Sequence, residues 1–225
     1  MTHVKGSRTR ARLLDAAARE VARHGIAGAG LGAIAEAAGL RTGSVYFHFS
    51  SKDELIGAML EEGIRRSLEY LDSGLAAVSA DATPAARLRA AVQAHARAVA
   101  ELADYAVVAL SAALSPTLPT AGPDAVAFRA LRHDYVHRWT GLVADAQRAG
   151  VLRPGPDPRL VRDLMLGAVN AAGLAGRDPD EVAAAVLGLL RLDPPGRAGV
   201  DQIDAVRAGS AGRSRDGAQP GGPNR

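Results

Sequence analysis

Residues suited to contacting nucleic acid are concentrated in one stretch, EAAGLRTGSVYFHFSSKDEL (residues 36–55). It places Tyr46, Phe47, His48 and Phe49 side by side, although the whole chain contains only four Tyr, three Phe and one Trp. Adjacent residues of a helix point in different directions, so at least two of these rings must face away from a core. A tyrosine can offer its ring to a thymine methyl group and its hydroxyl to a phosphate. The stretch therefore has the chemistry of a DNA-contacting surface.

Two short helices separated by a glycine turn would position these rings. The apolar pattern over residues 31–38 predicts a helix that ends at Gly39, and residues 42–49 predict a second helix. A longer helix over residues 8–24 precedes them, with Gly25 as its expected stop. This order is the helix-turn-helix plan, in which the second short helix enters the major groove by its N-terminal residues.

The second short helix has an inner and an outer side. Val45 and Phe49 are four residues apart, so both are expected to pack inward on Leu13, Val21 and Ile34. The other side is left for DNA, and a glycine there permits close approach of the backbone. The residues expected to face DNA are Arg41, Thr42, Gly43, Ser44, Tyr46 and His48.

The charge distribution agrees with an anionic partner at the N-terminal end. Residues 1–50 contain seven Lys or Arg and three Asp or Glu, whereas the whole chain has a net charge of only +3. Phosphate neutralisation supplies most nonspecific affinity for DNA, so a duplex would meet this end first. A solvated helix face is the plainer interpretation of the same charges.

The rest of the chain is also predicted to be helical, which makes the fold all-α. Three domains are expected: a helix-turn-helix DNA-binding domain (1–52), a helical ligand-binding and dimerisation domain (53–193) and a disordered tail rich in Gly and Pro (194–225). The helices expected after the first domain span residues 52–75, capped by Ser50 or Ser51; a stretch from Pro84 through Leu102, capped by Thr83; and residues 124–149, 158–175 and 179–192.

The segment IAEAAGLRTGSVYFHFSSKDEL resembles the DNA-binding signature of the TetR family of bacterial transcriptional regulators over about residues 8–60. The resemblance implies that Gly43 meets a base edge through its backbone and that Lys52 holds a phosphate at the start of the fourth helix. It also implies base or phosphate contacts from Thr42, Ser44, Tyr46 and His48. Two departures from the family pattern are Gly30, where a capping Ser or Thr is common, and Phe47, which lacks the hydroxyl of the usual tyrosine.

The same resemblance implies a regulator that binds two kinds of partner: a double-stranded DNA operator and a small-molecule effector. The stretch AGVLRPGPDPRLVRDLMLGAVN is similar to a subgroup of these regulators in which some members bind acyl-CoA thioesters, although the aromatic-rich segment that commonly follows is AAGLAG here. On the strength of this similarity, an acyl-CoA-like effector is expected. Residues on apolar helix faces that would line a cavity, or else form ordinary core, are His95, Tyr105, Phe128, Tyr135, Trp139, Met165 and Asn170.

A homodimer through the last two helices is implied by the family analogy. Small residues suit close helix packing between two copies, and these two helices carry Gly167, Ala168, Ala171, Ala184 and Gly188. Core packing within one chain is the alternative.

Several other classes of function find little support. The chain has no Cys, and His133 and His137 lack the third ligand or the Glu of an HExxH motif, so neither a metal nor a cofactor is expected. No GxSxG, P-loop or dinucleotide motif occurs, which argues against an enzyme. The sequence contains no run of eighteen apolar residues uninterrupted by a charged one, so no membrane-spanning helix is predicted. A cytoplasmic protein is expected. The expected function is a repressor released from a palindromic operator by a small apolar metabolite; a ligand-independent architectural DNA-binding protein is the alternative.

Overall fold

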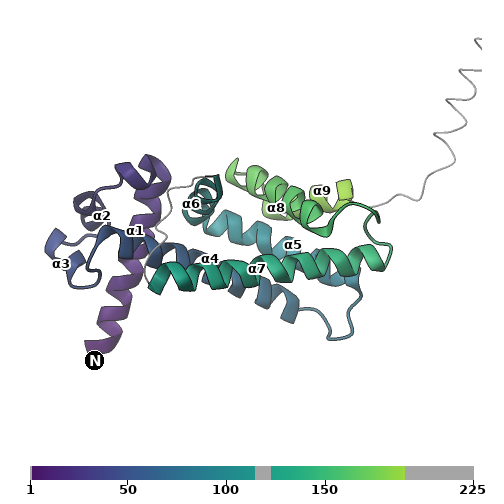
Figure 1. Cartoon of the computed structure of the whole chain (residues 1–225), viewed down its shortest axis with the longest axis horizontal. Helices are drawn as coiled ribbons and strands as arrows, with labels where there is room; N and C mark the ends of the chain where they lie inside the picture. The colour runs from purple at the N-terminus through teal and green to yellow at the C-terminus, as the bar shows by residue number, and fades with distance from the viewer. Residues whose placement is uncertain (1, 115–122, 191–225) are drawn as a thin grey trace, which may run out of the picture. The chain divides into compact units, whose positions relative to one another are not determined.

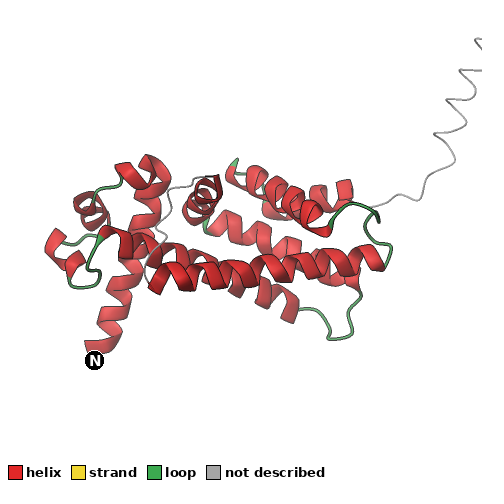
Figure 2. Ribbon diagram, viewed as in Figure 1, coloured by secondary structure: helices red, strands yellow, loops and turns green. Residues whose placement is uncertain are grey.

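The computed structural model describes residues 2–114 and 123–190, and every regular element in these ranges is a helix (Figure 1, Figure 2). The all-α prediction is confirmed. The predicted tail, residues 194–225, lies outside the described residues. The helices are α1 (Thr2–Gly28), α2 (Leu31–Ala37), α3 (Thr42–Tyr46), α4 (Lys52–Ala76), α5 (Pro84–Glu101), α6 (Ala103–Leu114), α7 (Pro123–Arg148), α8 (Pro158–Leu174) and α9 (Pro179–Leu190).

Glycines with positive φ shape the first three helices. Gly25 breaks the helical geometry of α1 (φ 71°, ψ 168°), as expected, but one further turn follows, so α1 ends at Gly28. Gly39 has φ 66° in the turn between α2 and α3, a backbone conformation that favours glycine. Arg12 of α1 donates a hydrogen bond to the carbonyl of Ala38, which fastens this turn to α1. Helix α3 is shorter than predicted, because it ends at Tyr46.

A first hydrophobic core holds α1, α2, α3 and the start of α4 together. Val45 and Phe49 are 1% and 2% exposed and pack with apolar residues of α1 and α2, which confirms the prediction that both point inward. The same core extends to Tyr105 and Val108 of α6. Helix α6 therefore contacts the helix-turn-helix region directly.

Helix α4 connects this core with the remainder of the chain. It begins where predicted: the Ser51 hydroxyl accepts a hydrogen bond from the Glu54 amide as its N-cap. Further along, α4 packs against α5 and α7 (Figure 1). A second core centred on the fully buried Trp139 joins α4, α5, α7, α8 and α9, and both cores belong to one compact unit.

Helix α5 agrees with the predicted stretch from Pro84 through Leu102, but no separate helix was predicted where α6 lies. At Leu102 the backbone leaves helical geometry (φ −113°, ψ 36°), although neither Gly nor Pro stands there. The change of direction lets Tyr105 and Val108 reach the first core beside α1. Tertiary packing, and not a local Gly or Pro, therefore sets the direction of α6.

Candidate DNA-binding surface and ligand cavity

The residues expected to face DNA lie on α3 and its flanks. Arg41, Thr42 and Gly43 are exposed, Ser44 and His48 are half-buried, and Tyr46 is 57% exposed. Local packing explains this outward face, because Val45 and Phe49 take the inward positions on either side of Tyr46. The surface can present backbone amides, hydroxyls and one phenol ring to a duplex.

Two residues outside the predicted set also belong to this surface. Phe47 is 87% exposed and meets the edge of the His48 ring, with centroids 5.4 Å apart. The guanidinium of Arg10 lies 5.3 Å from the centroid of the Phe49 ring, which places a positive charge of α1 beside the end of α3. An exposed phenylalanine next to the recognition helix was a signal available in the sequence, whereas the position of Arg10 depends on the tertiary fold.

Lys52 stands at the start of α4 and already has a partner. Its Nζ atom donates a hydrogen bond of 3.2 Å to the carbonyl of Ala27, near the end of α1. Carbonyls at a helix C-terminus carry partial negative charge, so they attract an ammonium group. A phosphate would have to replace or share this contact.

A cavity of about 220 Å³ lies among α4, α5, α6, α7 and α8. The structure brings five of the seven predicted ligand-binding residues to its wall: His95, Tyr105, Phe128, Tyr135 and Asn170. Exposed residues such as Arg132, Asp163 and Leu110 also line it, so the cavity reaches the surface.

Trp139 and Met165 are not among the lining residues. They are 0% and 1% exposed and pack in the second core. The Trp139 ring stands edge-on to the His95 ring, with centroids 5.7 Å apart. Trp139 therefore supports the cavity wall from behind.

His95 is a half-buried polar residue of the cavity wall. Its Nδ1 atom is 2.8 Å from the hydroxyl of Tyr135. Burial lowers the pKa of His95 to about 4, although the side chain of Asn170 opposes the decrease. The ring is partly accessible, but Nε2 is shielded and has no partner of normal hydrogen-bond geometry in the described part of the chain. His95 is thus a neutral group at neutral pH.

An arginine that was not predicted also lines the cavity. The Arg162 side chain is only 11% exposed, and it donates to the Thr140 hydroxyl over 2.7 Å. It forms an ion pair of 2.7 Å with Asp163. The neighbouring carboxylate partly balances its charge, so this wall is polar without a free buried cation.

The outer faces of α8 and α9 carry apolar and small residues that no described residue covers. Leu164 is 64% and Leu189 84% exposed. A Cβ atom placed on Gly167 or on Gly188 would meet no other element or side chain within 4 Å among the described residues. Leu160, Ala168, Ala171 and Ala184 are also exposed on these two helices.

His133 and His137 stack with ring planes 4° apart on the exposed side of α7. Within residues 2–114 and 123–190 no group of three or more His, Cys, Asp or Glu is placed to hold a metal. Nor do these ranges contain a helix with the length and apolar character needed to cross a bilayer.

Two family models match the chain. The model described as bacterial regulatory proteins, tetR family, matches residues 13–59, and the model of a tetracyclin repressor-like C-terminal domain matches residues 81–191. The HTH-type transcriptional regulator TtgR of Pseudomonas putida is 40% identical over 60 residues, which are 27% of this chain and 29% of TtgR. The chain thus aligns with about a third of that curated relative.

Solved structures share the fold over most of the chain. AibR, in complex with isovaleryl coenzyme A and operator DNA, superposes with a TM-score of 0.67 at 24% identity, covering 81% of this chain and 98% of AibR. The transcriptional regulator FadR from Bacillus subtilis, in complex with stearoyl-CoA, gives a TM-score of 0.62 at 20% identity, covering 80% and 96%. At this identity the likeness establishes the fold.

Proposed function

The chain belongs to the tetR family of bacterial regulatory proteins, a family of DNA-binding transcription regulators, and we propose that it is a repressor whose operator affinity falls when a small metabolite fills its cavity. The observation that carries this proposal is the combination of an exposed recognition helix with a separate cavity in one compact unit. An architectural DNA-binding protein would have no use for the cavity.

The proposed DNA contacts follow from exposure and chemistry. Tyr46 would insert its ring beside a thymine methyl group, while the backbone of Gly43 approaches a base edge. Arg41 is exposed at the N-cap of α3 and would meet a phosphate. Lys52 would exchange the Ala27 carbonyl for a phosphate oxygen, which is the stronger partner because it is fully charged.

A homodimer through α8 and α9 would complete the regulator. The exposed positions Leu160, Leu164, Gly167, Ala168 and Ala171 follow helical spacing, so they form one stripe along α8. A second copy related by twofold symmetry would cover the stripe with its own. The two recognition helices would then read half-sites about 34–36 Å apart, or a multiple of that distance, in a palindromic operator.

The cavity favours a small ligand. Its volume of about 220 Å³ is below the roughly 300–1,000 Å³ of sites for drug-sized molecules. A short acyl group, like the isovaleryl group bound by AibR, suits this volume better than a stearoyl chain. Arg132 lies on the exposed side of the lining, where it would meet the anionic part of a coenzyme A thioester. We therefore propose a short-chain acyl-CoA as the effector class.

Selection of duplexes from a random DNA library, followed by titration of the selected site, tests the proposal. We expect a near-palindromic site, and we expect isovaleryl-CoA to weaken binding more than stearoyl-CoA or free coenzyme A. Failure to enrich any sequence would refute the repressor assignment. Enrichment without a response to the thioesters would refute the effector class and favour ligand-independent binding.

A further inference from the structure

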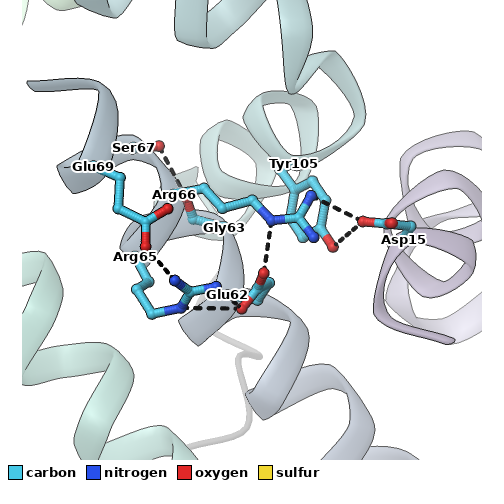
Figure 3. A network of polar contacts seen from close by, with 8 residues as sticks. All are labelled: Asp15, Glu62, Gly63, Arg65, Arg66, Ser67, Glu69 and Tyr105. Carbon is cyan, nitrogen blue, oxygen red and sulfur yellow. Dashed lines mark hydrogen bonds and ion pairs between the residues drawn. The ribbon is translucent and has the colours of Figure 1, made fainter. Parts of the chain in front are cut away.

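Tyr105 belongs to the wall of the cavity and to the contact with α1 at the same time. Its ring lines the cavity and is 9% exposed. Its hydroxyl donates a hydrogen bond of 2.9 Å to Oδ1 of Asp15 on α1 (Figure 3). Burial, followed by the negative charge of Asp15, raises the pKa of Tyr105, so the hydroxyl keeps its proton and remains a donor at neutral pH.

Arg66 of α4 fixes the same two groups. Its Nη1 atom is 3.0 Å from Oδ1 of Asp15, and its guanidinium carbon is 5.2 Å from the centroid of the Tyr105 ring. Its Nε atom donates to Glu62 over 2.6 Å. Figure 3 shows the contacts from Tyr105 and Arg66 converging on Asp15. Because all three elements share this cluster, a shift of Tyr105 disturbs the attachment of α1 to α4.

The Tyr105 ring has no spare room on the side of α4. A Cβ atom on Gly63 would lie 2.8 Å from Cδ1 of Tyr105, so the ring occupies the space that a side chain would take. Gly63 also lines the cavity. A ligand that fills the cavity beside Gly63 would press on this ring, and a displaced ring would carry the Asp15 bond with it.

We infer that Tyr105 transmits occupancy of the cavity to the DNA-binding helices: in the ligand-free protein its bond to Asp15 holds α1 in the DNA-binding arrangement, and displacement of the ring releases it. The inference rests on the proposed function and adds the residue through which the site acts. The sign of this effect follows from the proposed repression. A repressor binds its operator without ligand, so the ligand-free protein is the one that needs α1 in the DNA-binding arrangement. The plainer interpretation is that the cluster merely stabilises the fold.

Gly63→Ala tests the inference without any ligand. The added methyl group should push the ring as a ligand would, so operator affinity should fall by about 5-fold to 150-fold, the usual range of allosteric coupling. Gly74→Ala is the matched control on the same helix, because its Cβ would lie 2.6 Å from the Cβ of Ala94 on α5, away from Tyr105. It should cost stability yet leave the operator affinity of the folded protein near that of the parent.

Tyr105→Phe supplies a second, milder variant, which removes only the hydroxyl. We expect weaker operator binding, with Tyr70→Phe as its control, because the Tyr70 hydroxyl bonds to Glu101 of α5 and not to α1. If both changes act through the Asp15 bond, Gly63→Ala should have little further effect in the Tyr105→Phe background. Additive effects, or parental affinity in Gly63→Ala, would overturn the inference while the parent still binds its operator. A parent without an operator would refute the proposed function itself.

Discussion

The Nδ1 atom of His95 on α5 lies 2.8 Å from the hydroxyl of Tyr135 on α7, and both rings contact Trp139 at their edges. Burial raises the pKa of Tyr135 and lowers that of His95 to about 4, so the pair is neutral at neutral pH. A neutral pair suits the wall of a mostly apolar cavity, because no ionic charge has to be desolvated there.

Acid should destabilise the protein through His95. The unfolded chain binds a proton below about pH 6.5, whereas folded His95 binds one only below about pH 4. The unfolded state therefore holds more protons between these values, and the free energy of unfolding decreases as the pH falls through this window. The loss from this residue approaches about 3 kcal/mol near pH 4. Urea unfolding at a series of pH values measures it.

His95→Gln removes the titrating ring and provides the comparison. Its free energy of unfolding should depend less on pH between about 4 and 6.5 than that of the parent, even if it is lower at neutral pH. Parallel curves for the two proteins would show that His95 is not the group responsible.

Substitutions on the DNA-binding surface should separate base readout from phosphate contact. Tyr46→Ala should weaken binding to the selected operator by about 1–3 kcal/mol and have little effect on unrelated duplexes. Lys52→Ala should weaken binding to every duplex and reduce the salt slope by about one. Fluorescence anisotropy titrations at several salt concentrations measure both quantities.

Lys52 needs one further control, because it also donates to the Ala27 carbonyl. Lys52→Gln retains a donor for that carbonyl but lacks the charge, so it should reproduce the loss of salt dependence. Operator affinity equal to the parent in all three variants would remove α3 and the start of α4 from the DNA interface.

The dimer prediction has a clean test in Gly167→Leu. In the described part of the chain no other element or side chain lies within 4 Å of the new Cβ position, so the substitution should disturb a partner more than the fold. We expect sedimentation to show a weaker or distorted dimer, with lower operator affinity. Gly141→Leu is the control, because Gly141 is an equally open helical position on α7. Equal dimerisation in the two variants would place the interface elsewhere.

Local sequence signals predicted much of the fold because their physics is local. The hydroxyls of Ser51 and Thr83 accept amide hydrogen bonds at the starts of α4 and α5, as their sequence positions indicate. Val45 and Phe49 lie four residues apart and are both buried. Each of these features depends on residues within one or two helical turns.

The parts that were missed depend on long-range contacts. The break at Leu102 has no Gly or Pro signal. The bond between Tyr105 and Asp15 joins residues 90 positions apart, and no periodicity reports such a pairing. Apolar helix faces also cannot distinguish a cavity wall from a core, so Phe128 and Trp139 were grouped together although only Phe128 lines the cavity.

The distinction between wall and core decides how the cavity is best tested. Trp139→Ala would leave a void in the second core and cost about 3–5 kcal/mol, so a lost ligand response would have two explanations. Ala98→Leu avoids this problem, because Ala98 lines the cavity on α5 and the larger side chain enters existing space. We expect it to abolish the response to isovaleryl-CoA while operator binding without ligand stays near that of the parent.

Ala100→Leu makes the same change at an exposed position two residues away and should keep the response. Anisotropy titrations of the operator with and without the thioester measure the two operator affinities of each variant. A full response in Ala98→Leu would mean that the effector binds outside this cavity.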